Sequence, residues 1–189
     1  IKQLTFSNSY CSSPSWSPNG KEIAFLSESR LFKVSSEGGT PSLITDYDVG
    51  GTAYWVTDAQ IYYHKLGNRN FYIYNLVTKE KKLLVQNDSV GWMFNPQLSP
   101  DSLKLAVQWT RKIDDNLTTG VWLISLKDSS QKLLLKGNII PLGWSKESKW
   151  IYAINLIKNT LEILMVSVDT RETKIVYSSS TGKIKYHND

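Results

Sequence analysis

The residues best able to do acid–base or nucleophilic chemistry are few and lie far apart in the sequence. The chain has two histidines, His64 and His187, and one cysteine, Cys11. A nucleophile needs a base within hydrogen-bond reach, and neither histidine lies near Cys11 in the sequence. The string GWSKE at 143–147 lacks the second glycine of the G-x-S-x-G nucleophile elbow. We therefore predict no catalytic residues and a chain that is not an enzyme.

Side chains that bind metals are equally sparse. Asp46 and Asp48 flank one tyrosine, and Asp114 is followed directly by Asp115. Neither pair has the dense alternation of acidic residues that a strong calcium loop requires. No cysteine and histidine have the spacing of zinc ligands. Such carboxylates are typical of solvated loops, so we predict no metal site and no cofactor.

The segments that must position all these residues form a sequence repeat. Four segments each place an apolar anchor before a polar turn and an apolar strand: PSWSPNGKEIAFLS (14–27), AYWVTDAQIYYHK (53–65), PQLSPDSLKLAVQ (96–108) and LGWSKESKWIYAI (142–154). Their anchors are Trp16, Trp55, Leu98 and Trp144, separated by 39, 43 and 46 residues. A period of about 40–45 residues is the length of one four-stranded propeller blade.

The content of each unit fits four antiparallel strands. The segment SPNG at 17–20 suits a type I turn, because proline presets φ at the second position and glycine is favoured at the fourth. The apolar residues of 103–107 then alternate with other residues in the period of two that a strand requires. We expect the second strands of the units near 22–27, 60–65, 103–108 and 149–155. The predicted fold class is all-β, a β-propeller of four-stranded antiparallel blades with about four complete blades. An immunoglobulin-like sandwich also has short, regularly spaced strands, but it does not predict this recurring signature.

The signature W-S-P-N/D-G-K-x-I-A-F resembles the repeat of the TolB-like (WD-like) β-propeller superfamily. It also resembles the propellers of prolyl oligopeptidases and tricorn-type proteases. The resemblance covers nearly the whole chain and is closest at 14–27 and 96–108. Family propellers have six to eight blades, so the resemblance implies that this chain is part of a larger ring. It specifies a fold and not an activity, because folds of this kind host many functions.

The resemblance also sets the expected boundaries. We expect blades at 12–47, 51–86, 93–136 and 139–179, with 1–7 as the outer strand of a preceding blade and 180–189 as the start of a further blade or a tail. The two end blades of such an arc would each present an uncovered face. Ile151, Tyr152, Ile163 and Leu164 of the last blade are therefore expected to contact solvent.

One region is a candidate binding surface. In propellers of this kind, the loops between blades and those joining second and third strands open on the same face. We predict that the connection around 92–94 and a long loop at 109–120 lie beside each other there. Large apolar groups beside charges are typical of protein- or peptide-binding surfaces. The candidate binding residues are Trp92, Met93, Phe94, Trp109, Arg111, Lys112, Asp114 and Asp115. The alternative interpretation is that Trp92 and Phe94 only fill the gap between blades.

Composition limits the partners. The chain has 189 residues, 41% of them apolar, and no apolar run approaches the roughly 18 residues of a spanning helix. The net charge of +5 comes from scattered basic residues, which does not favour nucleic acid. We predict a protein or peptide partner, no nucleic acid, no membrane insertion, and contact with the remainder of a parent chain or self-association. The compartment stays open, with a periplasmic or extracytoplasmic location favoured.

Three functions remain open at this point. The first is a non-catalytic binding or sensor module of a larger, bacterial, multidomain protein. The second is the substrate-gating propeller segment of a prolyl oligopeptidase-like or tricorn-like peptidase whose catalytic domain lies outside this chain. The third is a structural scaffold.

Overall fold

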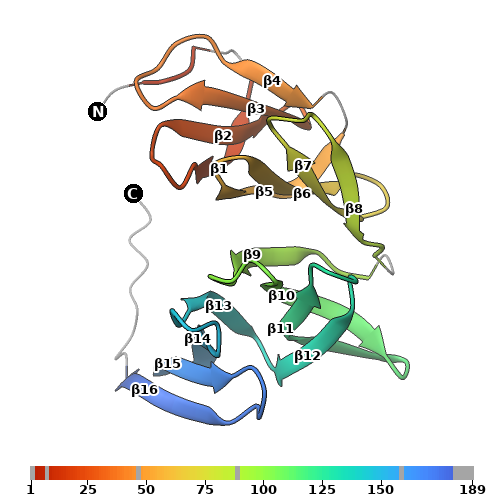
Figure 1. The fold of residues 1–189 in the computed structure, drawn as a ribbon, viewed down its shortest axis with the longest axis vertical. Helices are drawn as coiled ribbons and strands as arrows, with labels where there is room; N and C mark the ends of the chain where they lie inside the picture. Colours follow the sequence, from red (N-terminus) through yellow and green to blue (C-terminus); the bar gives the residue numbers. More distant parts are fainter. Residues whose placement is uncertain (1–2, 7–8, 46–47, 88–89, 158–159, 181–189) are drawn as a thin grey trace. The chain divides into compact units, whose positions relative to one another are not determined.

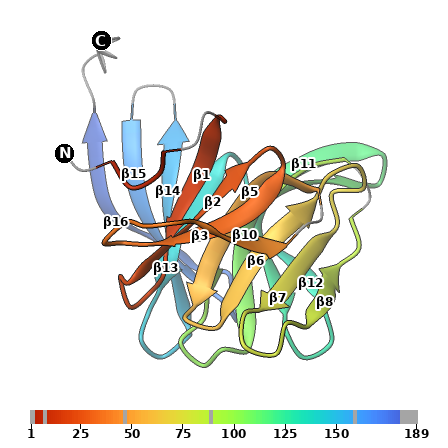
Figure 2. The same ribbon diagram turned by 90° about the horizontal axis from the view of Figure 1, so that it is seen from above.

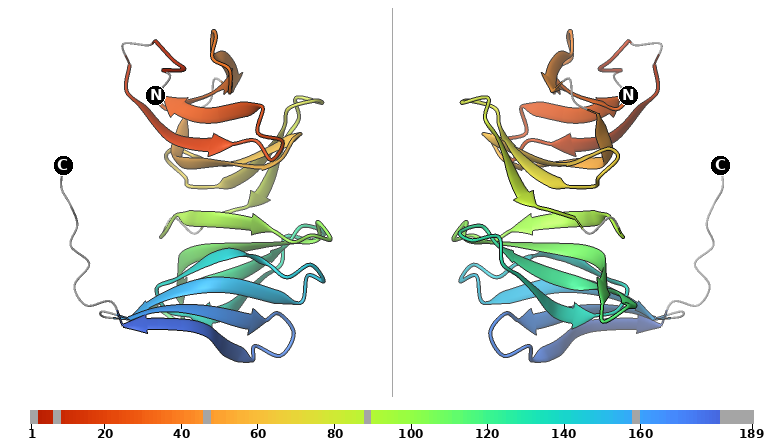
Figure 3. Two further views of the ribbon diagram at one scale, coloured as in Figure 1. Left: turned by 90° about the vertical axis from the view of Figure 1, so that its left-hand side faces the viewer. Right: turned by 90° about the vertical axis from the view of Figure 1, so that its right-hand side faces the viewer.

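The chain folds into antiparallel β-sheets (Figure 1). The computed structural model describes residues 3–6, 9–45, 48–87, 90–157 and 160–180, and these contain sixteen strands and no helix. They form four sheets of four strands, each in chain order, with every neighbouring pair antiparallel. Figures 2 and 3 give further views of these sheets. The predicted all-β fold with four-stranded blades is confirmed.

Two compact units divide the chain, residues 1–92 and residues 93–189, with two blades in each. Blade 1 of the first unit contains β1 (Cys11–Trp16), β2 (Glu22–Ser27), β3 (Arg30–Ser35) and β4 (Ser42–Thr45). Blade 2 contains β5 (Val49–Thr57), β6 (Gln60–Lys65), β7 (Phe71–Asn75) and β8 (Lys81–Val85).

The second unit has the same organisation. Blade 3 contains β9 (Met93–Leu98), β10 (Lys104–Ile113), β11 (Asn116–Ser125) and β12 (Gln131–Lys136). Blade 4 contains β13 (Ile139–Trp144), β14 (Trp150–Ile157), β15 (Thr160–Ser167) and β16 (Thr173–Ser180). The second strands β2, β6, β10 and β14 lie where the repeat predicts them. Residues 3–6 form no strand, and their assignment to a preceding blade stays a prediction.

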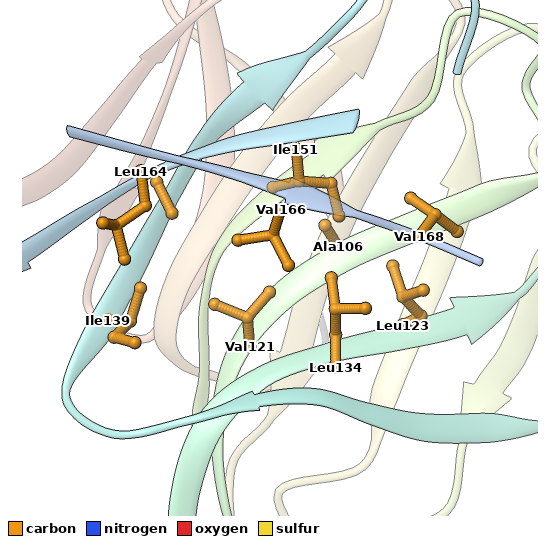
Figure 4. Close-up of a cluster of buried hydrophobic side chains, with 10 residues drawn as sticks. Ala106, Val121, Leu123, Leu134, Ile139, Ile151, Leu164, Val166 and Val168 are labelled. Carbon is orange, nitrogen blue, oxygen red and sulfur yellow. The ribbon is translucent and has the colours of Figure 1, made fainter. Parts of the chain in front are cut away.

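The core of each unit lies between its two blades. In the second unit, Val121 and Leu134 of blade 3 lie against Val166 of blade 4, and all three are buried (Figure 4). In the first unit, Leu26 and Leu31 of blade 1 share a buried cluster with residues of blade 2 that include Trp55. Burying one such aliphatic side chain contributes about 1.5–3 kcal/mol, so each unit is held mainly by these contacts between sheets.

The expectation that all four end-blade residues contact solvent is wrong for two of them. Ile151 is fully buried and Leu164 is 5% exposed, because both belong to the cluster that faces blade 3. Tyr152 and Ile163 alternate with them along β14 and β15, so they lie on the opposite face, where they are half-buried. The period of two therefore divides the four residues between the two faces of one sheet.

The repeated turn has a common geometry in three blades. The backbone N–H of Gly20, Ser102 and Ser148 donates to the carbonyl of the serine three residues earlier, at 2.8–2.9 Å. Each of these three residues has φ between 57° and 70°, which explains the glycine in the first turn. The first serine of each of these turns also donates its backbone N–H to the carbonyl five residues later, in Ser17, Ser99 and Ser145 alike. The turn therefore closes the hairpin that connects the first and second strands of a blade.

The turn serine also acts through its side chain. The Ser99 hydroxyl donates to Asp101 at 2.6 Å and accepts the backbone N–H of Lys104 at 2.9 Å. Hydrogen bonds from the Ser99 hydroxyl and the Leu103 N–H hold the pKa of Asp101 below its ordinary value. Ser17 makes the equivalent contacts with Asn19 and Glu22.

Candidate binding surface

The longest hairpin of the described chain is formed by β10 and β11. Its ten residue pairs run from Lys104 opposite Ser125 to Ile113 opposite Asn116. The neighbouring strands stop earlier, because β9 pairs with β10 only as far as Trp109 and β12 pairs with β11 only as far as Gly120. Residues 110–113 and 116–119 therefore pair mainly with each other, with one further backbone hydrogen bond from the Gly137 N–H to the Thr119 carbonyl at 2.9 Å. These residues and the turn 114–115 are called the hairpin tip below.

The sequence prediction of a long loop at 109–120 is wrong. The polar residues of this segment include three threonines, and threonine is a good strand former. Asp114 and Asp115 have φ of 47° and 63°, the left-handed values that a two-residue hairpin turn needs and that aspartate tolerates better than most residues. The sequence signal that could have revealed the hairpin was this Asp-Asp pair between two segments rich in β-branched residues.

Polar contacts stabilise the hairpin tip. The hydroxyls of Thr110 and Thr119 lie 2.8 Å apart across the two strands. The Lys112 ammonium lies 2.6 Å from the Asp115 carboxylate, although both side chains are largely exposed and the pair contributes little. Leu117, opposite Lys112 in the register, is 67% exposed. The tip thus presents a large apolar side chain beside a charged pair, and sequence reasoning had missed Leu117.

Arg111 lies over an aromatic pair at the base of the tip. Its guanidinium carbon is 4.4 Å from the ring centroid of Trp109 and 5.2 Å from that of Trp122. The two indoles meet edge to face, and the Trp122 indole N–H donates to the Trp109 carbonyl at 3.1 Å. Arg111 also donates to the side-chain oxygen of Gln131 on β12. A guanidinium held over two indoles is positioned by stacking, with its charge over the face of blade 3 between the tip and Gln131.

The other predicted site residues have different surroundings. Met93 and Trp109 are fully buried and face each other in the register of β9 and β10, so they support the surface from beneath. Phe94, the next residue of β9, is 38% exposed. Asp114 and Asp115 form the turn of the hairpin.

Trp92 packs on blade 2 of the first unit. Its ring and that of His64 are perpendicular, with centroids 5.1 Å apart, and the guanidinium carbon of Arg69 lies 5.1 Å from the Trp92 ring centroid. A Cβ atom at Gly50 would come within 2.8 Å of the indole, so the ring lies directly on the backbone of β5. This agrees with the interpretation of Trp92 as a packing residue. That Trp92 shares one face with the hairpin tip stays a prediction.

The histidine and serine considered for catalysis have structural roles. His64 is buried, and its Nδ1 lies 3.0 Å from the carbonyl of Arg69. Ser145 begins the turn of blade 4, and its hydroxyl accepts the backbone N–H of Trp150 at 3.3 Å. The preceding Trp144 donates its indole N–H to the carbonyl of Gln97 on blade 3. Within the residues that the structure describes, no three His, Cys, Asp or Glu side chains gather as metal ligands, and no helix could cross a membrane.

Comparison with known proteins identifies the fold. No protein-family profile and no curated protein match the sequence. Among solved structures, a putative TolB from Agrobacterium tumefaciens superposes with a TM-score of 0.69 at 17% identity, over 92% of this chain and 64% of that one. TolB from Acinetobacter baumannii gives 0.65 at 18% identity, over 93% and 45%. An acylaminoacyl peptidase from Pyrococcus horikoshii gives 0.64 at 12% identity, over 89% and 32%.

These likenesses confirm the resemblance that the repeat signature carries. At identities below 20% they concern the fold alone. The chain spans less than two thirds of the length of either TolB. It is a β-propeller chain with the fold of the TolB-like and prolyl oligopeptidase-like propellers.

Proposed function

We propose that this chain is a non-catalytic binding module of a larger protein and that the hairpin tip docks a protein or peptide partner. The observation that supports the proposal is the register of blade 3, in which residues 110–119 extend past both neighbouring strands. Beyond Trp109 and Gly120 the hairpin adds no further strand pairing with β9 or β12. Loops and hairpins held by a rigid sheet are common sites of recognition.

The chemistry of the tip favours a protein surface over a small ligand. Leu117 supplies an exposed apolar anchor, and Arg111 offers a guanidinium whose orientation is already fixed by two indoles. Arginine is among the residues that carry much of the energy of protein interfaces, and the exposed leucine beside it adds apolar area that a partner can bury. Lys112 and Asp115 add a charged rim that sets orientation more than affinity.

Selection of peptide ligands tests the proposal. A displayed random peptide library is selected on the purified chain, and the enriched peptides are measured against the double variant Leu117→Ser with Lys112→Ser. We expect that variant to bind them at least about 10-fold more weakly. The matched control is Leu142→Ser, which removes a leucine that is 44% exposed on β13 of the same unit. Peptides that bind both variants as well as the unaltered chain would place recognition elsewhere.

A second function is supported by the likeness to the acylaminoacyl peptidase. In that case the chain would be the substrate-gating propeller segment of a peptidase, and the catalytic groups would belong to another domain. The two functions differ in one measurable respect. If the chain is a gating segment joined to its peptidase, altering the hairpin tip should change the lengths of the peptides that are cleaved. If the chain is a binding module, no peptide substrate should be turned over.

A further inference from the structure

At the opposite end of the same hairpin, blade 3 and blade 4 enclose a groove that the hairpin tip does not reach. Its volume is about 370 Å³. Three of its lining residues are apolar, Leu103, Leu123 and Val168, and three are lysines, Lys104, Lys127 and Lys132. From this combination we propose that the groove binds an acidic peptide segment that carries one large apolar side chain.

The apolar part of the groove is built by the interface between the two blades. Leu123 and Val168 are buried members of the core cluster that joins blade 3 to blade 4. Leu103 stands at the rim and is 58% exposed. A volume of this size lies at the lower end of the range for ligand pockets, which suits one large side chain better than a cofactor.

The register brings the lysines to that interface. Lys104 faces Ser125, and Lys132 faces Leu123, on the side of blade 3 that packs against blade 4. Lys127 follows in the turn between β11 and β12. Lys127 and Lys132 are exposed and form no ion pair with any residue that the structure describes.

The acidic residues at this end are ionised, and two of them are held by the turns of blade 3. Asp128 accepts the backbone N–H of Ser130 at 3.0 Å, and hydrogen bonds from Ser130 and Ser125 lower its pKa to about 2. Asp101 is bound within its own turn and lies 3.9 Å from Lys104, at the limit of an ion pair. Asp169 lines the groove from blade 4. With Lys104 paired to Asp101, the lining keeps Lys127 and Lys132 against Asp169, and this excess of positive charge favours a ligand with carboxylates.

A defined probe tests this groove. The peptide EDLDE, labelled with a fluorophore, is titrated with the full chain and followed by anisotropy, beside the peptides QNLNQ and EDSDE. We expect EDLDE to bind at least about 10-fold more tightly than either control peptide, because one lacks the charges and the other lacks the apolar group. Raising the ionic strength from about 50 to about 300 mM should weaken its binding, since the lysines are exposed.

Substitutions then locate the site. Lys127→Gln with Lys132→Gln should weaken EDLDE binding at least about 10-fold, and Leu103→Ser should weaken it as well. Lys79→Gln with Lys82→Gln, which removes the same charge from the other unit, should leave it unchanged. An equal loss in both pairs would mean that net charge alone attracts the peptide, and absence of binding at about 1 mM peptide would also overturn the proposal. The proposal would also be overturned if a single-stranded oligonucleotide bound through the same lysines more tightly than EDLDE does. The hairpin-tip variant should bind EDLDE normally, so this groove and the proposed function fail or succeed independently.

Discussion

The backbone N–H of Asp101 donates to the hydroxyl of Ser148 at 3.1 Å, which joins the turn of blade 3 to the turn of blade 4. The first unit contains the same relationship, because the backbone N–H of Asn19 donates to the Asp58 carboxylate at 3.1 Å. In both units the third residue of one repeated turn contacts the turn of the next blade. The turn sequence thus closes a hairpin and also links neighbouring blades.

Replacing the acceptor of this link should destabilise the second unit slightly. For Ser148→Ala we expect the free energy of unfolding to fall by about 0.5–1.5 kcal/mol, because the Asp101 N–H loses its partner. Chemical denaturation followed by tryptophan fluorescence measures the change. Ser129→Ala, in the turn between β11 and β12, is the control and should change stability by less than about 0.5 kcal/mol. Equal stability of the two variants would show that the link between turns contributes nothing.

Gly120 should not tolerate a side chain. A Cβ atom there would collide with the carbonyl oxygen of Leu135 and come within 2.7 Å of the Leu133 side chain. We expect Gly120→Ala to cost about 2–4 kcal/mol, because β12 must move away from β11. Gly143→Ala is the matched control in the same unit, since a Cβ atom added at Gly143 would meet no atom within 4 Å. Thermal melts of both variants measure the difference, and a melt of Gly120→Ala equal to that of the control would contradict it.

Tyr62 should make the protein sensitive to alkali. Burial raises the pKa of its hydroxyl to about 12 from 10.0, so the folded state holds this proton longer than the unfolded state. The contribution of the protonated Tyr62 to the free energy of unfolding is fully present below pH 10. It is lost as the pH rises towards 12 and amounts to at most about 3 kcal/mol. The hydroxyl is buried and has no hydrogen-bond partner among the described residues, so Tyr62→Phe should not destabilise the protein at pH 7.

The measurement is urea denaturation at about pH 8 and about pH 11 for both proteins. Tyr62→Phe should lose less stability between the two pH values than the unaltered chain does. A loss of the same size in both would assign the alkaline sensitivity to other groups.

Asn87 holds the exit of blade 2. Its side-chain amide donates to the carbonyls of Arg69 and Gly91 at 3.0 and 2.8 Å, and the residue is 8% exposed. We expect Asn87→Ala to destabilise the first unit by about 1–3 kcal/mol, because two buried carbonyls lose a donor. Asn68→Ala removes an exposed amide from the neighbouring turn and serves as the control. Hydrogen exchange of the amides in β5 and β6 should accelerate in the first variant alone.

The outer strand of blade 4 should promote self-association. All its residues from 173 to 178 are exposed, and Ile175, Val176 and Tyr177 are more than 50% exposed, so this strand edge, which pairs with no second neighbour among the described strands, carries apolar groups on both faces. Such an edge is a template for pairing with another chain. We expect sedimentation of the isolated chain to depend on concentration and Val176→Lys to reduce that dependence. A dispersed monomer at every concentration would refute this prediction.

Local chemistry explains which parts of the fold could be predicted from sequence. The turn at 17–20 was predictable because proline, asparagine and glycine each have a positional preference within four residues. The orientation of Ile151 and Leu164 was not, because it depends on which face of β14 and β15 meets blade 3. The stacking of Arg111 was equally hidden, since Trp122 reaches it only through the cross-strand register.

The hairpin tip lacks neighbouring strands on both sides, which affects where a protease can cut the folded chain. Arg111 and Lys112 lie in the part of β10 that pairs with β11 and not with β9, so we expect trypsin to cut there through local opening of the hairpin rather than through global unfolding. A cut there would separate the sequence at the tip while Lys104–Trp109 and Gly120–Ser125 remain paired in their sheet. The two pieces of the cut chain would then stay associated. The rate of cutting would report whether a bound partner covers the hairpin tip.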